Sequence, residues 1–235
     1  LLEDNNTYAT FFILGEIAEK YPSVINKIIE KGHEVAFHGW SHKPLMELSE
    51  KQFTNEIKKF KKIYSKSIGF RAPEFSLNNS TIWALKILIK EKFIYDSSIF
   101  PTWTPLYGMY RAPIKPYNPS LVDLRYEENN NPLIEFPLAT ASIAGIKIPI
   151  AGGFWLRFLN NQFIRRGVDK LNSNGYPAII YVHNWELDPE TPVVTSRFTE
   201  RIIKYHNIDK TKEKLITLLK DSSFTSFERY IEEGY

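Results

Sequence analysis

The stretch HEVAFHGWSH, residues 33–42, places two histidines directly after a short apolar run. The run Val35-Ala36-Phe37 is typical of the end of a buried strand, and Gly39 then ends the regular backbone. We therefore expect His38 at the carboxyl end of this strand and His42 in the following loop. Two imidazoles held in this way can bind one divalent metal such as zinc, although this spacing alone also fits ordinary loop histidines.

Strands and helices alternate on both sides of this stretch. Pro22 near the start and Gly32 after the end delimit one helix, and Ser49 with Gln52 fits a capping box at the start of another. A βαβα order of this kind is typical of parallel strands joined by crossover helices. The expected strands are residues 9–14, 33–37, 68–70 and 93–95, and the expected helices are residues 22–31, 49–64 and 81–92.

The rest of the chain is less regular. Residues 101–137 are rich in Pro, Asn and Tyr, which predicts long loops around short strands. Residues 133–139 and 146–150 are expected to pair as strands. Further on we expect helices at residues 163–172 and 210–220, a strand at 178–182, a loop at 186–194 and short elements at 224–231.

Composition limits the class of protein. With 235 residues, 43% apolar and 24% charged, the chain is predicted to form one domain over residues 1–235. A net charge of +3 without a long basic block argues against a nucleic-acid partner. The absence of cysteine excludes disulfides, thiolate metal sites and cysteine nucleophiles. No apolar run approaches the roughly 18 residues of a membrane span.

Four polar residues share one position in this pattern, at the end of an expected strand. They are His38, Arg71, Asp96 and His183. Each has an ordinary explanation by itself, such as a surface arginine, a turn aspartate or a core histidine. Active sites of parallel barrels lie at the carboxyl ends of the strands. Together the four residues therefore predict an active site at that edge.

The segments that hold these residues resemble polysaccharide deacetylases of the NodB-homology type, in carbohydrate esterase family four. The closest resemblance is to the exosortase-associated branch. The resemblance covers nearly the whole chain in the right order. It rests on ATFFILG (9–15), GHEVAFHGWSH (32–42), GFRAPEFS (69–76), YDSSIFP (95–101), IPIAGGFWLRF (148–158) and YVHNWELDPETP (181–192).

This resemblance implies a distorted (β/α) barrel with fewer than eight strands, and hydrolysis of the N-acetyl amide of an amino sugar. It also implies that His38 and His42 bind a metal, most simply zinc. His183 would be the general acid, Arg71 would orient the catalytic aspartate, and Asp96 would tune the acid histidine. A backbone N–H of the turn at residues 73–75 would hold the oxyanion. For Arg157 two interpretations are open: it reaches the site, or it pairs with a surface acid.

One part of the family's machinery is not found. Relatives carry an acidic pair after their first strand, which supplies the general base and the third metal ligand. That strand should precede residues 9–14 by one helix, but the chain starts at Leu1 and Asp4 lies in a polar turn. Two explanations are open: the first strand, with the aspartate ligand, lies upstream of residue 1, which we favour, or the protein has lost the motif. Because Leu1 is not a methionine, we expect the native start upstream of it, and the localisation is open, with the cytoplasm slightly favoured.

Two other functions remain open at this point. A catalytically silent glycan-binding domain would keep the barrel without the reaction. An amidohydrolase or deformylase of the same fold would act on a small amide instead of an N-acetylated carbohydrate. The sequence decides neither the sugar nor the oligomeric state.

Overall fold

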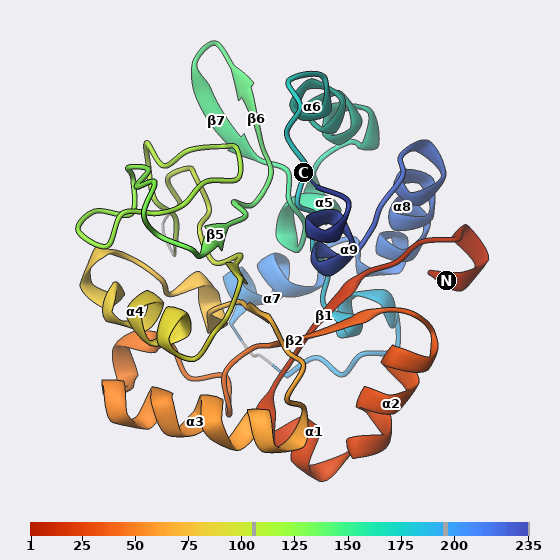
Figure 1. Cartoon of the computed structure of the whole chain (residues 1–235). Helices are drawn as coiled ribbons and strands as arrows, with labels where there is room; N and C mark the ends of the chain where they lie inside the picture. The colour runs from red at the N-terminus through yellow and green to blue at the C-terminus, as the bar shows by residue number, and fades with distance from the viewer. Residues whose placement is uncertain (105–106, 195–196, 235) are drawn as a thin grey trace. The chain divides into compact units, whose positions relative to one another are not determined.

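The strand predicted at residues 33–37 lies inside a five-stranded parallel sheet in the computed structural model (Figure 1). The strands are hydrogen-bonded in chain order, so their carboxyl ends share one edge. The α/β fold with a parallel sheet is thereby confirmed. The strands are β1 Thr10–Ile13, β2 Glu34–Phe37, β3 Gly69–Phe70, β4 Tyr95–Asp96 and β5 Ile134–Glu135.

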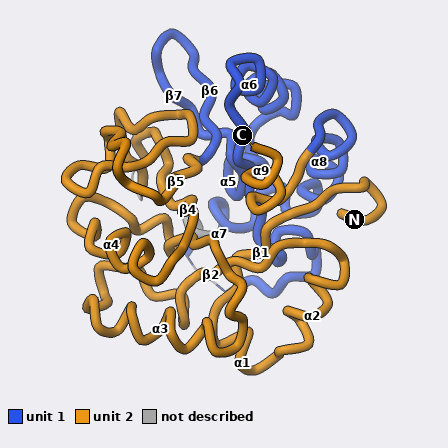
Figure 2. The backbone as a smooth tube through the Cα atoms, viewed as in Figure 1, with its two compact units in different colours: residues 1, 138–223 blue, residues 2–137, 224–235 orange. Residues whose placement is uncertain are grey.

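The structure describes residues 1–104, 107–194 and 197–234. The chain divides into two units (Figure 2). We call residues 2–137 with 224–235 the sheet unit, and residues 138–223 with Leu1 the hairpin unit. The expectation of one domain over residues 1–235 stays a prediction. Of the loops expected at residues 101–137, positions 105 and 106 lie outside the described residues.

The three helices expected in the sheet unit are present in the expected order, and α1 was not predicted. The capping box of Ser49 and Gln52 is present at the start of α3, and Phe53, Ile57 and Phe60 form its buried stripe. The third expected helix begins later than predicted, after a short 3-10 turn. The helices are α1 Gly15–Lys20, α2 Pro22–Glu30, α3 Glu50–Ile63, α4 Trp83–Lys90 and α9 Phe227–Glu232 (Figure 1).

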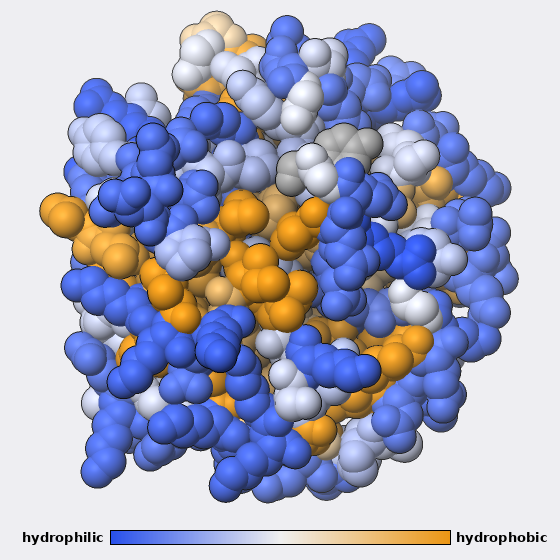
Figure 3. Space-filling model, in the orientation of Figure 1, coloured by the Kyte–Doolittle hydropathy of each residue, from blue (hydrophilic) through white to orange (hydrophobic). Residues whose placement is uncertain are grey.

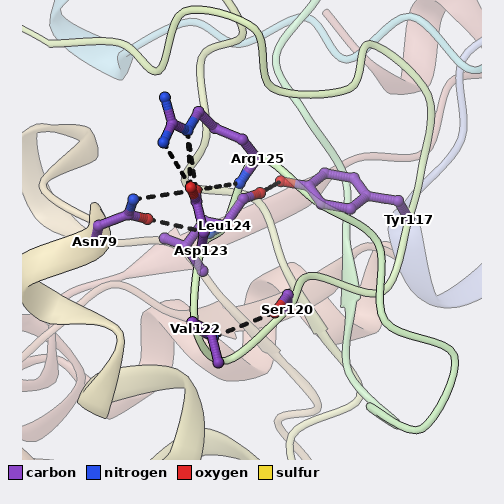
Figure 4. A network of polar contacts seen from close by, with 7 residues as sticks. All are labelled: Asn79, Tyr117, Ser120, Val122, Asp123, Leu124 and Arg125. Carbon is purple, nitrogen blue, oxygen red and sulfur yellow. Dashed lines mark hydrogen bonds and ion pairs between the residues drawn. The ribbon is translucent and has the colours of Figure 1, made fainter.

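A network of polar side chains stabilises the long connection between β4 and β5, residues 97–133 (Figure 4). Asp123 accepts hydrogen bonds from the Arg125 side chain and from Asn79, and Asn79 accepts one from the backbone of Leu124. The buried Tyr117 hydroxyl donates to the Leu124 carbonyl at 2.6 Å. Hydrogen bonds from the Arg125 side chain, then from its backbone, hold the pKa of Asp123 below its ordinary value. Side-chain hydrogen bonds therefore help to order this irregular segment, whose described residues form isolated bridges at Tyr117 and Pro119 in place of regular strands.

The hairpin unit contains an antiparallel strand pair and four helices among the described residues. In the α6 helix, Ile164, Val168 and Leu171 are buried. No helix within the described ranges has both the length and the apolar character needed to cross a bilayer. Figure 3 shows mostly hydrophilic side chains on the visible surface, around a central apolar area. The elements are β6 Thr140–Ile143, β7 Ile146–Pro149, α5 Phe154–Phe158, α6 Asn161–Ser173, α7 Phe198–Tyr205 and α8 Ile208–Asp221.

Two expectations for this part of the chain are wrong. Of the pairing expected between residues 133–139 and 146–150, the structure shows a single backbone hydrogen bond, from Ile150 to Ala139, because Ile134–Glu135 joins β4 in the parallel sheet. The hairpin lies later, where Ala144 and Gly145 both have positive φ and allow a two-residue turn. Residues 178–182 do not form a regular strand, since only two isolated bridges, at Ile179 and Tyr181, connect them to neighbouring segments.

A pair of buried acids closes the carboxyl edge of the sheet between β4 and β5. Asp96 and Glu135 are partners in the strand register and are both 0% exposed. Asp96 Oδ1 accepts a hydrogen bond from Ser98 and Glu135 Oε1 accepts one from the backbone of Ile99, whereas Asp96 Oδ2 and Glu135 Oε2 are buried and accept none. Burial raises the pKa of both groups, and the charge of Asp96 raises that of Glu135 well above its ordinary value. One shared proton, carried by Glu135, satisfies this arrangement.

The shared proton makes stability depend on pH. A carboxyl group with a raised pKa in the folded state stabilises the fold at pH values below its unfolded pKa. This stabilisation is lost as the pH rises through the folded pKa. In Glu135→Gln a neutral amide replaces the protonated carboxyl at every pH. We expect melting curves of the wild type and this variant to agree near the ordinary pKa of 4.5 and to separate at higher pH, where the variant is the more stable.

The exposed acid Glu47 provides the control for this prediction. Glu47→Gln is expected to leave the pH dependence of melting unchanged. A Glu135→Gln variant that loses stability with rising pH as steeply as the wild type would show that no proton is held between the two carboxyl groups.

Candidate functional site

The parallel register places two of the predicted site residues, His38 and Arg71, in one row with Ser97 at the carboxyl edge of the sheet. His38, Arg71 and Ser97 each donate a backbone hydrogen bond of 3.0 Å to the preceding strand. Each lies one position beyond a register partner in β2, β3 or β4. Because successive side chains of a strand alternate between faces, these three side chains share one face of the sheet. Asp96 precedes Ser97 and therefore belongs to the opposite face.

A backbone carbonyl fixes the orientation of the His38 ring. Its Nδ1 lies 2.8 Å from the carbonyl oxygen of Arg71. A carbonyl can only accept a hydrogen bond, so Nδ1 carries the proton. In the neutral ring the lone pair is then on Nε2, which is the atom that can bind a metal. A histidine ligand held by a backbone carbonyl through its other nitrogen is a common arrangement in metal sites.

His42 lies beside His38, as the sequence predicted. The ring centroids are 5.1 Å apart and the rings are inclined at 76°. His42 is exposed and has φ +61°, a left-handed backbone that is uncommon for a residue with a side chain. Gly39, with φ +77°, makes the tight path between the two histidines, and a Cβ there would come within 3.1 Å of Pro73. The loop thus adopts a strained conformation that brings both imidazoles together.

The guanidinium of Arg71 is held in one orientation. Its Nε and Nη2 each donate a 2.7 Å hydrogen bond to Ser97, one to the carbonyl and one to the hydroxyl. Its carbon Cζ lies 4.2 Å from the centre of the Phe12 ring. A buried cation fixed by a fork of two bonds and an aromatic face loses little entropy when it orients a neighbouring group.

The turn after Arg71 contains a second strained segment that the sequence did not predict. Glu74 and Phe75 have φ +55° and +51°, both left-handed without being glycine. Such conformations cluster at functional sites, because the surrounding fold must stabilise them. This is the turn in which the family resemblance places an oxyanion donor, and that role stays a prediction.

The donor set fits a metal in part. His38 and His42 offer two neutral nitrogen ligands, which suit zinc and its neighbours. A catalytic zinc usually has three protein ligands. Over residues 1–104, 107–194 and 197–234, no group of three His, Cys, Asp or Glu side chains is close enough to hold a metal. The aspartate expected as third ligand stays a prediction.

In the hairpin unit, a second cluster surrounds His183; we call His183, Glu186 and Arg157 the His183 cluster. Glu186 Oε2 accepts hydrogen bonds from the backbone N–H of His183 at 2.8 Å and from its Nδ1 at 2.9 Å. The other oxygen of Glu186 forms an ion pair with Arg157. Both charged side chains are buried, whereas that of His183 is 48% exposed. Glu186 therefore holds the backbone and Nδ1 of His183 in place, while part of the His183 ring is exposed to solvent.

Sequence reasoning missed Glu186, which falls in the predicted loop at residues 186–194. The spacing of three residues between His183 and Glu186 is that of a capping box, and this signal is visible in the sequence. Arg157 was expected either to reach the site or to pair with a surface acid; its partner Glu186 is buried, which excludes the second interpretation, and Glu186 contacts His183. Asp96 is fully buried, so any part that it takes in catalysis passes through its neighbours. Its expected effect on His183 stays a prediction.

Two successive segments of the chain match known protein families. Residues 1–88 match the family described as polysaccharide deacetylase. Residues 97–232 match a domain described as "Domain of unknown function (DUF3473)". A peptidoglycan-N-acetylglucosamine deacetylase from Bacillus cereus is 37% identical over 90 residues, which are 35% of this chain. The match spans only 32% of that relative's length.

Solved structures agree on the fold. A Mycobacterium smegmatis protein assigned to the polysaccharide deacetylases is similar with a TM-score of 0.61 at 18% identity, over 99% of this chain and 73% of that one. An allantoinase is similar with a TM-score of 0.58 at 14% identity, over 98% and 68%. The expected fold, a (β/α)-barrel-like architecture with fewer than eight strands, is thereby confirmed.

The two family matches follow one another in the order of the predicted motifs. The first contains His38, His42 and Arg71, and the second contains Asp96's neighbour Ser97 and the His183 cluster. The finer assignment to the exosortase-associated branch stays a prediction. The chain belongs to the family described as "Domain of unknown function (DUF3473)", which covers residues 97–232, and its residues 1–88 match the polysaccharide deacetylase family.

Proposed function

We propose that this chain is the catalytic part of a metal-dependent hydrolase that removes N-acetyl groups from the amino sugars of a glycan. The observation that carries the proposal is the pair His38 and His42 at the sheet edge, with His38 Nδ1 held by the Arg71 carbonyl. Support comes from the family, and from the Bacillus cereus relative that is named for N-acetylglucosamine in peptidoglycan.

His38, through Nε2, and His42 would hold the metal, together with the aspartate that the family resemblance implies. When bound, a metal such as zinc supplies a Lewis acid for the acetamide carbonyl and lowers the pKa of water to about 7. Arg71 is rigid enough to orient an acidic partner beside that site. In the strained turn at residues 73–75, the backbone N–H of Glu74 would donate to the oxyanion, because Pro73 has no N–H and the N–H of Phe75 donates to the Ala72 carbonyl.

His183 would complete the reaction by giving a proton to the departing amine. Hydrolysis breaks the bond between the acetyl carbon and the sugar nitrogen, and the acetyl group takes its new oxygen from water. The nitrogen leaves poorly as an anion, so a general acid is needed, and proton transfer of this kind typically contributes about 10²–10⁴-fold. With Nδ1 bonded to Glu186, Nε2 is the nitrogen from which His183 can donate.

Loss of one imidazole tests this proposal. In the native protein that carries this chain, we expect about one metal per chain and acetate release from N-acetylglucosamine oligomers. His38→Ala is expected to lose most of the metal and at least about 10²-fold of the activity, because a Lewis acid is removed. Metal analysis and an acetate assay on the same samples measure both.

His206, a histidine in the hairpin unit outside the proposed site, provides the matched control. His206→Ala should keep both metal and activity. Bound metal without acetate release, together with hydrolysis of a small cyclic amide or formamide, would replace the proposal with the same-fold amidohydrolase. Neither metal nor hydrolysis in the wild type would leave a silent glycan-binding domain.

Arg71→Lys tests whether orientation, and not charge alone, is needed at this position. A lysine keeps the positive charge but cannot donate to the carbonyl and the hydroxyl of Ser97 in the fork geometry of arginine. We expect kcat to fall by about 10–10²-fold while metal content is retained, since misplacement of a catalytic partner has an effect of this size. Unchanged kcat would remove Arg71 from the catalytic machinery.

A further inference from the structure

We propose that Glu186 is the positioning residue of the general acid: its carboxylate orients His183 and stabilises the imidazolium from which the proton is given. This inference rests on the proposed function and adds to it. The family resemblance assigns the tuning of the acid histidine to Asp96, which lies in another segment of the chain. The geometry points instead to a carboxylate three residues from His183.

The contacts of Glu186 leave its carboxylate little freedom. One oxygen accepts two hydrogen bonds from His183, at 2.8 Å from the backbone N–H and 2.9 Å from Nδ1. The other oxygen forms the ion pair with Arg157. Two bonds to one residue fix both the position and the ring orientation of His183. Since a carboxylate accepts only, Nδ1 carries a proton in both the neutral and the cationic ring.

Arg157 keeps Glu186 in its charged, accepting form. Arg157 is 2% exposed, and its Nη2 donates a 2.6 Å hydrogen bond to the carbonyl of Ile203. Burial lowers the pKa of Arg157, yet an arginine remains charged under ordinary conditions. A buried cation without an anion would be costly, so the pair is retained as a unit. Glu186 is thus fixed from the side opposite His183.

Among the described contacts of His183, Glu186 is the only acid. The Tyr181 ring lies edge-on to His183 at 5.6 Å, and Trp185 stacks on it at 5.6 Å. From α8, the ammonium of Lys214 donates to the carbonyls of Leu156, Arg157 and Leu159, at the end of the helix that carries Arg157. Besides Arg157 and Glu186, the described contacts place three titratable groups near the cluster: Tyr181, Lys214 and, with its ring 6.2 Å from that of Trp185, Tyr205.

A carboxylate at Nδ1 serves a proton donor in two ways. It stabilises the cationic ring, so more His183 is protonated at a given pH. It also holds Nε2 as the donating atom, because the other nitrogen is engaged. The Asp-His pair of serine proteases uses the same logic for orientation and for stabilising the imidazolium. The proton goes from Nε2 to the leaving nitrogen and is replaced from water, so no further reactant is needed.

Glu186→Gln tests this role through the pH profile of kcat. The glutamine side chain can turn its carbonyl to Arg157 and its amide N–H to Nδ1, which removes the carboxylate from the ring. We expect the alkaline limb of the kcat profile to move down by about 1–3 pH units, the range for loss of an adjacent opposite charge, with KM little changed. Glu190, an exposed acid in the same loop, gives the control variant Glu190→Gln, which should keep the wild-type profile.

Nuclear magnetic resonance of the His183 ring gives a readout that needs no activity. In the wild type the neutral ring should carry its proton on Nδ1, and in Glu186→Gln on Nε2, with titration at a lower pH. Should Glu186→Gln fail to fold, Arg157→Met combined with Glu186→Gln removes both buried charges together and must show the same fall in titration pH.

The outcomes separate the inference from the proposed function. An active wild type, an inactive His183→Ala and an unshifted profile in Glu186→Gln would overturn the role of Glu186 and leave the deacetylase proposal intact. A wild type without deacetylase activity would remove the proposed function. In that case the His183 ring still tests the contact with Glu186. If Glu186→Gln leaves the tautomer and the titration pH of His183 unchanged, the positioning role of Glu186 is overturned. If both change, that role is retained.

Discussion

The hydrogen bond from His38 Nδ1 to the Arg71 carbonyl is the interaction on which the site in the sheet unit depends. It joins the ends of β2 and β3, and it can form only because the parallel register places His38 and Arg71 side by side. Register therefore determines the tautomer, and the tautomer determines which nitrogen can bind a metal. A slip of one residue would turn both side chains to the other face.

In the His183 cluster the histidine ring is also oriented through Nδ1, but by a carboxylate and not by a backbone carbonyl. Both His38 and His183 engage Nδ1 and leave Nε2 for chemistry, but the acceptors differ. A neutral carbonyl orients a ring without strongly favouring its cation, which suits a metal ligand. A carboxylate favours the cation as well, which suits a proton donor. The charge of the group behind each ring thus matches the role that the sequence resemblance implies.

The sequence predicted what local patterns encode, and missed what contacts over long distances decide. The strands around residues 9–14 and 33–37 and the capping box at Ser49 were found because apolar runs and cap residues are local signals. The strand at Ile134–Glu135 was placed in the wrong pairing, because its partner β4 lies beyond a long loop. Glu135 and Glu186 were missed as functional candidates, since a buried acid looks like any other in sequence. Only the fold shows that Glu135 is buried beside Asp96 and that Glu186 contacts a histidine.

The most direct test of this account is anomalous X-ray scattering at the zinc absorption edge from crystals of the native protein grown with zinc. The account predicts a peak at about 2.0–2.1 Å from Nε2 of His38, with a ring nitrogen of His42 at a similar distance. Nδ1 of His38 should remain bonded to the Arg71 carbonyl. A peak elsewhere in the molecule, or a His38 ring turned so that Nδ1 faces the metal, would contradict it.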